Sequence, residues 1–326
     1  MEIGSFIELD IENIGEYFPD DENVARLNSA RAGIYHSLQL LGSNEVYMPY
    51  YQCPTVNDFL LKKGVTIFKY QLSNEFEPQL QSVIKDSTVL LVNYFGIFSN
   101  DFLKKLTKKY KKVIIDNGPA FYNPPIEGCM NVYSARKFFG VPDGCYVIGK
   151  QANMLTERYP QDYSSETSLF LLERHEVGCS ASYEERMKNE ERIDNADILS
   201  MSRLTKSLLS GINYQRIRDI RRRNFEYAHN QYKELNLLDV TRHYDDSCVP
   251  MFYPLVIEEA SMVEELTRRQ IFTGRRWNAV LKEVDLDSFE GWLSRYMIPL
   301  PIDQRYGKEV LDYVFQNVQQ ILKIKK

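Results

Sequence analysis

The sequence predicts an α/β protein, with a large three-layer domain built on a mostly parallel sheet and a small α+β domain at the C-terminal end. Three observations lead to this prediction. Apolar, strand-like segments alternate with helix-periodic segments between residue 30 and about residue 116. Two of the apolar segments, TVLLVNYF and KVIID, are nearly uninterrupted, as in strands covered on both faces. From about residue 240 onward, short strands and helices are mixed.

The first part of the chain is a regular succession of helices and strands. Asn28 and Ser29 are good N-cap residues for the first helix, and Gly64 stops the second. In chain order, the expected elements are a helix over 30–41, a strand over 45–49, a helix over 54–63, a strand over 65–70, a short helix over 78–85, a strand over 88–95, a helix over 101–110 and a strand over 112–116.

The pattern beyond residue 116 is less regular. We place the domain boundary so that residues 1–215 form the large domain and residues 216–326 the small one. The elements expected here are strands over 131–135 and 145–149, a charged and largely helical stretch over 181–235, strands over 251–257 and 295–302, and helices over 261–270 and 308–323.

Charge and composition exclude several classes of protein. The 326-residue chain has a net charge of −5, whereas a nucleic-acid surface needs a strong basic excess. We expect no signal peptide at the acidic start of the chain, and no membrane span, because no apolar stretch is long enough to form one. The five cysteines form no C-x-x-C pair and the four histidines lack metal-ligand spacing. We therefore expect a cytoplasmic protein that binds no nucleic acid, membrane or metal.

Polar residues stand at the ends of expected strands and at the start of the first helix. Asp116 ends KVIID, and Asn93 lies near the end of TVLLVNYF, where parallel sheets bind ligands. Ser29, Ala30 and Arg31 open the first helix, whose free N–H groups and dipole suit a phosphate. Capping of the helix and of the strand end explains the same residues without a ligand.

The segment SARK, between two apolar strands, adds a lysine to this set. It places Ser134 three residues before Lys137. Lysine rarely enters a buried segment unpaired, and desolvation makes its amine a nucleophile. A surface lysine beside Arg136 is the structural alternative. Together, the helix start, the strand-end acid and the lysine match pyridoxal phosphate (PLP), whose aldehyde needs a lysine and whose ring nitrogen needs a carboxylate.

With these residues the chain resembles the fold-type-I PLP enzymes, and among them the DegT/DnrJ/StrS sugar aminotransferases. The similarity extends over most of the chain. The most informative stretch is SARKFFGVPDG, together with the IID before it. The other similar segments are NSARAGIYHSLQLLGSNEVYMPYYQCPTV, LLVNYFG, VIIDNGPAF, SRLTKSLL and YMIPLPIDQRYGKEVLDYV.

The resemblance implies roles for individual residues and an assembly. Lys137 is the Schiff-base lysine, and Asp116 pairs with the ring nitrogen of the cofactor. The backbone of Ala30 and Arg31, beside Ser29, meets the phosphate. The fold of the family implies a homodimer with active sites at the interface between its subunits.

Cys145, which follows Gly144, stands where the family has the second glycine of a pair, and four further positions also depart from the pattern of the family. The positions concerned are a ring-stacking aromatic, a His or Gln near the cofactor hydroxyl, a serine five residues before the lysine and an asparagine lent by the neighbouring subunit. In this sequence they are Cys53, Pro119, Val132 and Met201, in the same order.

Other residues are candidates to replace the lost contacts. We expect Cys53 to contact the cofactor, Arg31 and Ser134 to bind its phosphate, and Asn93 to meet its hydroxyl group.

The resemblance implies a PLP-dependent aminotransferase. Its acceptor would be a keto sugar, linked to a nucleotide, and its donor an amino acid such as glutamate. Two alternatives stay open. One is dehydration of a keto sugar on the same fold, although the resembling dehydratases have a histidine in place of Lys137. The other is an inactive or regulatory cofactor-binding protein, which Pro119, Val132 and Met201 favour.

Overall fold

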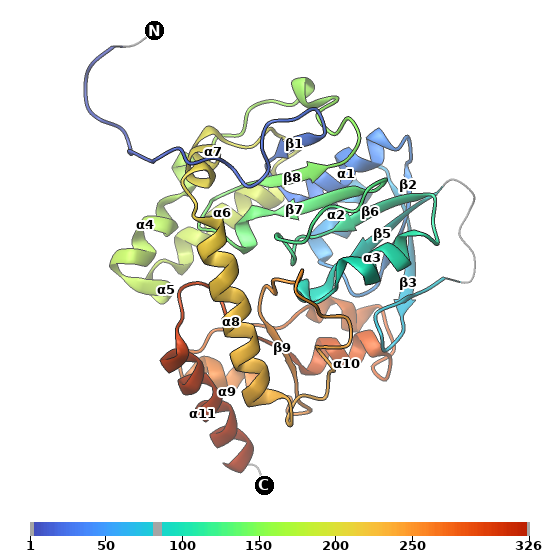
Figure 1. Ribbon diagram of the computed structural model, residues 1–326, viewed down its shortest axis with the longest axis vertical. Helices are drawn as coiled ribbons and strands as arrows, with labels where there is room; N and C mark the ends of the chain where they lie inside the picture. The colour runs from blue at the N-terminus through green and yellow to red at the C-terminus, as the bar shows by residue number, and fades with distance from the viewer. Residues whose placement is uncertain (1–2, 81–86, 325–326) are drawn as a thin grey trace.

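The chain folds around a mixed β-sheet with helices on both faces, as the computed structural model of residues 3–80 and 87–324 shows. Within these residues there are eight strands in the large sheet and two in a smaller one, around which the C-terminal helices pack (Figure 1). The predicted α/β class is confirmed. None of the helices in the described ranges is long and apolar enough to cross a membrane.

The large sheet has the strand order β1-β8-β7-β6-β5-β2-β3-β4. From β7 to β3 all neighbours are parallel, whereas β8 is antiparallel to β7 and β1, and β4 is antiparallel to β3. The bounds are β1 Val24–Leu27, β2 Glu45–Pro49, β3 Thr66–Leu72, β4 Pro78–Gln79, β5 Thr88–Val92, β6 Lys112–Asp116, β7 Met130–Ser134 and β8 Cys145–Ile148.

Helices connect these strands and lead into the C-terminal part, where β9 and β10 pair antiparallel. The long helix α8 runs from the large sheet to the C-terminal helices and packs against α11 (Figure 1). The bounds are α1 Ala30–Leu40, α2 Pro54–Lys62, α3 Asn100–Thr107, α4 Leu169–Glu176, α5 Gly178–Ala181, α6 Tyr183–Asn195, α7 Arg203–Ser210, α8 Tyr214–Tyr232, β9 Tyr253–Val256, α9 Met262–Arg268, α10 Phe289–Tyr296, β10 Met297–Leu300 and α11 Lys308–Ile324.

The central strands bury both of their faces, which explains their uninterrupted apolar sequences. Successive side chains of a strand point to opposite faces. Leu90 of β5 and Ile114 of β6 accordingly join the cluster beneath α1 and α2. Val89 and Ile115 join the opposite cluster, which continues through α3 and α8 into β9 and β10. One apolar core therefore extends from the sheet into the C-terminal part. The boundary after residue 215 stays a prediction.

Helix α1 lies unusually close to the sheet. A Cβ atom placed on Gly33 would stand 2.8 Å from Cys145 Sγ and 3.0 Å from side-chain atoms of Val132 and Val147. Only glycine tolerates this approach. The N-terminal end of the helix is capped by Ser29, as predicted, through a 3.3 Å bond from the Ala32 amide to the Ser29 hydroxyl.

Most of the predicted elements are confirmed, and the differences concern residues 78–85, strand β1 and the helices α4 and α10, which were not expected. The short helix expected over 78–85 is wrong at its start, because Pro78 and Gln79 form strand β4 against Leu72 and Gln71. Proline is compatible with such an edge strand. The rest of that expected helix lies mainly outside the described residues. Strand β1 was not expected, because its sequence VARL carries a charge in the middle and is only four residues long.

Candidate functional site

The predicted site residues meet at the carboxyl ends of the parallel strands. Asp116 is the last residue of β6 and Asn93 directly follows β5. Ser134 ends β7, and the 3₁₀ turn η2 (Ala135–Lys137) carries Lys137 directly after it. Gln52 lies three residues beyond the end of β2. This edge of a parallel sheet is the usual place of a ligand.

Asp116 is buried and firmly oriented. Its Oδ1 accepts the Gly118 amide at 2.8 Å, and its Oδ2 accepts Gln52 Nε2 at 3.1 Å. Gln52 is itself fixed, because its Oε1 accepts the Cys53 amide at 2.7 Å. An ionised carboxylate has about four acceptor sites, so Asp116 keeps capacity for a further donor.

Lys137 and Asp116 converge on Gly118. A Cβ atom on this glycine would lie 2.8 Å from Asp116 Oδ1 and 3.0 Å from Lys137 Nζ. The Lys137 amine forms no hydrogen bond or ion pair with the residues that the structure describes. A free amine and an oriented carboxylate are thus held around one point, with no side chain between them at residue 118.

Asn93 is buried beside Asp116. Its backbone amide donates to the Asp116 carbonyl at 3.0 Å, and its Nδ2 donates to Asn117 Oδ1 at 3.0 Å. Its Oδ1 is buried without a partner among the described residues. An unpaired buried acceptor is costly, so this atom suits a ligand hydroxyl group.

The start of α1 offers backbone donors but not the predicted arginine charge. The amides of Ala30 and Arg31 have no acceptor within the described ranges, as expected of the first turn of a helix. The Arg31 side chain is directed elsewhere and forms an ion pair with Asp194 of α6. Ser134 is buried, and its hydroxyl has no hydrogen-bond partner among the described residues. These groups form a donor set for an anion.

The departing positions have structural roles that explain their side chains. Cys53 is the N-cap of α2, and its Sγ lies 3.3 Å from Thr55 Oγ1. Pro119 lines a small cavity beside Lys137. Val132 is fully buried in the cluster beneath α1, and Met201 is buried beside Gly144.

Lys137 lies where two cavities meet. The smaller one, about 20 Å³, lies between the large sheet and the C-terminal part, and Arg276 and Trp277 close it. The larger one, about 610 Å³, lies between η2, α4, α6 and the segment 303–305.

The larger cavity is rich in arginine. Arg136 pairs with Glu190 at 2.5 Å and Arg305 with Asp303 at 2.7 Å, while Arg174 has no partner within the described part of the chain. Arg221 is almost fully buried, and desolvation lowers its pKa to about 10. With Lys137 and Arg186 also in its wall, this cavity suits an anionic ligand.

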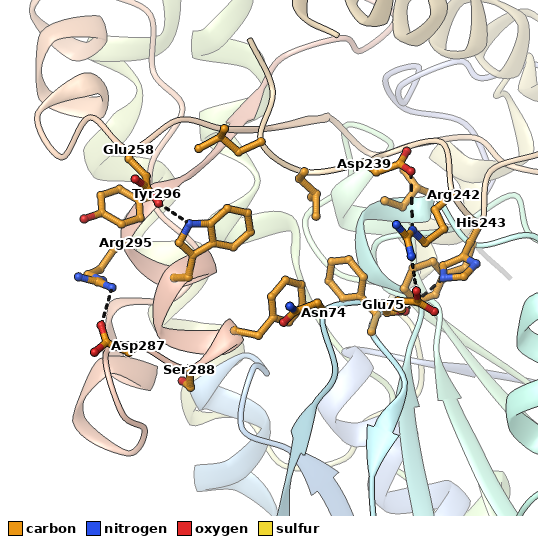
Figure 2. Close-up of a pocket in the computed structure, with 17 residues that line it drawn as sticks. Asn74, Glu75, Asp239, Arg242, His243, Glu258, Asp287, Ser288, Arg295 and Tyr296 are labelled. Atoms are coloured by element: carbon orange, nitrogen blue, oxygen red, sulfur yellow. Dashed lines mark hydrogen bonds and ion pairs between the residues drawn. The ribbon is translucent and has the colours of Figure 1, made fainter. Parts of the chain in front are cut away.

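Another large cavity contains none of the predicted site residues. It lies between the segment before β4 and α10, and measures about 660 Å³ (Figure 2). Its charged groups already have partners: Arg242 pairs with Glu75, and Trp292 Nε1 donates to Glu258 at 3.0 Å. The described residues contain no group of three or more acidic, histidine or cysteine side chains that could hold a metal ion.

Two residues of this site were not selected from the sequence, Gln52 beside Asp116 and Arg276 beside Lys137. Gln52 was not selected, although it follows the end of β2 as Asn93 follows β5. Arg276 belongs to a run of two arginines, for which a solvated charge run is the favoured interpretation over contact with an anionic substrate. Only the fold places it beside Lys137.

Solved structures share this fold. The chain matches Spr1654 from Streptococcus pneumoniae in its PLP form with a TM-score of 0.61 and 15% identity, over 91% of this chain and 86% of that one. The aminotransferase TlmJ from Streptoalloteichus hindustanus gives 0.61 and 15%, over 94% and 87%. The sugar aminotransferase CalS13 from Micromonospora echinospora gives 0.58 and 16%, over 91% and 87%. Identities this low show a shared fold alone. No family model and no curated protein matches the sequence.

Proposed function

We propose that this protein is a PLP-dependent aminotransferase that transfers an amino group from an amino acid such as glutamate to a nucleotide-linked keto sugar. One observation carries the proposal: the free amine of Lys137 and the oriented carboxylate of Asp116 converge on Gly118 at the carboxyl end of the sheet. The fold, which known aminotransferases share, supports it.

The residues present fit this cofactor. Lys137 would hold its aldehyde carbon and Asp116 its ring nitrogen, while the amides of Ala30 and Arg31 and the hydroxyls of Ser29 and Ser134 would surround its phosphate. The unpartnered Oδ1 of Asn93 suits its hydroxyl group. When bound, PLP supplies an electron sink for the electrons of the carbon–hydrogen bond that transamination breaks.

The chain's own residues then have separate tasks. Asp116, held by Gln52 and by the Gly118 amide, keeps the proton on the ring nitrogen. The Lys137 amine would act as general base and take the proton from the amino-acid α-carbon. It would then act as general acid and give this proton to the cofactor carbon. Its position next to Gly118, without a competing partner in the described residues, leaves the amine free to move.

The arginine-rich cavity supports an anionic acceptor. Its volume suits a substrate that carries phosphate groups, as a nucleotide-linked sugar does, and so does Arg174, which has no partner among the residues that the structure describes. We also infer a homodimer, supported by the exposed apolar side chains of α4, of the residue directly after it and of α6: Leu169, Leu172, Val177, Tyr183 and Met187. The five free cysteines agree with a reducing, cytoplasmic location.

A cofactor-binding protein without turnover is the second candidate. The ion pair of Arg31 with Asp194 favours it, because this pair withdraws a cation from the phosphate side of the site. The two candidates differ in one respect: only the enzyme transfers nitrogen from the bound amino acid.

Substitution of Lys137 tests the proposal. We expect the purified protein to turn yellow with PLP and to lose that visible absorbance on incubation with glutamate, with release of 2-oxoglutarate. Lys137→Ala should abolish both, because no other described amine lies beside Gly118. Lys150→Ala, an exposed lysine after β8, is the control and should behave as the wild type. Visible absorbance that is unchanged in Lys137→Ala contradicts the cofactor assignment. Stable absorbance in the wild type with every amino acid supports the protein without turnover.

A further inference from the structure

The turn that carries Lys137 is short and is held by a distant segment. Turn η2 spans three residues, and the hydrogen bonds of a 3₁₀ turn have poor geometry, so it has little rigidity of its own. Directly after it, the carbonyl oxygen of Phe138 accepts Gln304 Nε2 at 2.8 Å. Gln304 lies between β10 and α11. The C-terminal part of the chain therefore binds the backbone of the residue next to Lys137.

A second side chain fixes the orientation of Gln304. Arg221 of α8 donates from Nε to Gln304 Oε1 at 3.0 Å. Because the amide oxygen is bound to this donor, the amide nitrogen is the end that faces the Phe138 carbonyl. The Arg221 guanidinium group also lies over the Phe138 ring, 4.6 Å from its centroid. Arg221 thus contacts Phe138 directly through the ring and indirectly through Gln304.

The same helix fixes the main chain around Gln304. Asn224 of α8 is buried, and it lies on the same helix face as Arg221 because the two are three residues apart. Its Nδ2 donates to the carbonyl oxygens of Ile302 and Tyr306, at 3.1 and 2.9 Å. Gln304 lies between these two residues. It is therefore held through its backbone as well as through its side chain.

Stability alone does not explain the arginine at position 221. The residue is 2% exposed, and its donors bind Gln304 and the Met251 carbonyl, at 3.0 and 2.9 Å. It forms no ion pair with any residue in the described ranges 3–80 and 87–324. The carboxylate of Asp303 instead binds Arg305, through bonds of 2.7 and 2.8 Å. A buried charge without an acidic partner costs free energy, so a role beyond packing is expected of it.

We propose that Arg221 and Gln304 are positioning residues, which hold the turn η2 and with it the Lys137 amine. The amine then stays beside Gly118, where the candidate site needs it. This role rests on the proposed aminotransferase function. Neither side chain has to touch the cofactor, because each acts through the backbone or the ring of Phe138. The position of the C-terminal part is transmitted to the lysine in this way.

Two ligands separate the binding of the cofactor from its reaction with the lysine. Pyridoxine 5′-phosphate has the ring and the phosphate of PLP but no aldehyde, so it binds without reacting with an amine. We expect Gln304→Leu to slow the appearance of the visible absorbance of bound PLP about 10- to 100-fold, because a small displacement of a reacting group has an effect of this size. Its affinity for pyridoxine 5′-phosphate, measured by calorimetry, should equal that of the wild type. A merely structural defect would weaken the binding of both ligands.

Further variants test the path from Arg221 to Phe138. Gln304→Glu keeps an oxygen for Arg221 but offers the Phe138 carbonyl no donor when ionised, so it should react as slowly as Gln304→Leu. Arg221→Lys keeps the charge but not the Nε bond that orients the amide, and it should also be slow. The double variant Arg221→Lys/Gln304→Leu should be close to Gln304→Leu alone, because one residue acts through the other. Arg223→Lys and Gln316→Leu, at exposed sites of α8 and α11, are controls and should react as the wild type.

A measurement without PLP keeps the test independent of the proposed function. A trace of acetic anhydride acetylates Lys137 and the exposed Lys150 in the same molecule, and peptide mass spectrometry gives the ratio of the two. We expect Gln304→Leu to raise this ratio, because a released turn exposes the Lys137 amine to the reagent. Gln316→Leu should keep the ratio of the wild type.

The outcomes decide the two proposals separately. A wild-type rate of PLP reaction in Gln304→Leu overturns the positioning role, as does an unchanged acetylation ratio or an equal loss of affinity for pyridoxine 5′-phosphate. A double variant as slow as the product of the two single effects overturns the path from Arg221 through Gln304. If Arg221→Lys does not fold, as judged by circular dichroism, the two Gln304 variants decide. Absorbance that does not depend on Lys137 overturns the aminotransferase proposal, whereas the acetylation ratio still decides whether Gln304 holds the turn.

Discussion

Asp116 takes its orientation from Gln52, a residue whose importance the sequence does not reveal. Gln52 Nε2 donates to Asp116 Oδ2 at 3.1 Å, while the side-chain oxygen Oε1 of Gln52 accepts the Cys53 amide at 2.7 Å. Both side chains are buried. The neutral amide thus presents a donor to the carboxylate without adding a charge.

Substitution of Gln52 should therefore act through the charge state of Asp116. Gln52→Leu removes one donor, and we expect about ten-fold weaker PLP binding, or about 1.4 kcal/mol. Gln52→Glu should be worse, because it replaces the donor with a second buried carboxylate directly beside Asp116. Titration with PLP, followed by visible absorbance, measures both. Gln316→Leu, an exposed site on α11, is the control. Tighter binding in Gln52→Glu than in Gln52→Leu contradicts this role.

For single residues, the sequence indicates which side chains have suitable chemical groups better than it indicates which partners these side chains contact. Lys137 and Asp116 were selected from their segments, and the fold brings them to the same point around Gly118. Arg31 was expected to give its charge to a phosphate, yet it pairs with Asp194, which is far away in the sequence. A long side chain such as that of Arg31 can contact several different partners, and the packing of the folded chain determines which partner it contacts.

Helix α1 shows how one element serves both the core and the site. Its N-terminal end faces the carboxyl edge of the sheet, while Gly33 allows the close approach to β7 and β8. Further along the helix, His36 is fully buried. Its Nδ1 lies 2.9 Å from the Tyr159 hydroxyl, and its Nε2 lies 2.7 Å from the Ala152 carbonyl oxygen. Burial lowers the pKa of His36 from its usual value.

The buried His36 predicts a pH dependence of stability. Because its pKa is lower in the folded state than in the unfolded chain, the unfolded state binds more protons below about pH 6.5. Its contribution is thus fully present above that pH and is lost as the pH falls further. The free energy of unfolding, measured by urea denaturation between pH 7 and pH 5, should fall less steeply for His36→Gln. The same substitution at exposed His175 should keep the slope of the wild type; parallel slopes for both variants argue against this cause.

At the element scale, amphipathic helices and buried strands were predictable because their apolar periodicity is local. Helices α1, α2 and α3 and strands β2, β5 and β6 lie close to their expected positions. Strand β4 was mistaken for the start of a helix, because a strand of two residues is too short to show the alternation of apolar and polar side chains that identifies a strand. Its structure depends on pairing with β3 and not on its own sequence.

The molecule as a whole is held together by contacts between segments that are distant in the chain. Glu290 of α10 is fully buried, and its Oε1 accepts the amide of Leu72 in β3 at 2.5 Å. The surrounding apolar cluster includes residues of β5, α8, β9 and β10. The C-terminal part and the large sheet are therefore coupled by a polar anchor within a shared core.

Removal of this anchor should weaken the whole protein. Glu290→Ala leaves the Leu72 amide without an acceptor in a buried place, which costs about 1–3 kcal/mol of unfolding free energy. Glu290→Gln keeps an acceptor oxygen and should lose less. Chemical denaturation measures both, with Glu309→Ala, an exposed residue of α11, as the control. Equal stability of Glu290→Ala and the control would show that the anchor contributes little.

The sequence by itself determined the α/β class and most helices and strands of the large sheet, and it indicated the residue types of the proposed PLP site, because apolar period, caps and strand-end polar residues are local properties. The tertiary structure decided which of these residues meet. It brought Gln52 to Asp116, turned Arg31 toward Asp194 and placed Arg276 beside Lys137. These pairings depend on strand order and on the packing of the C-terminal part, which arise from contacts between distant segments and leave no local pattern in the sequence.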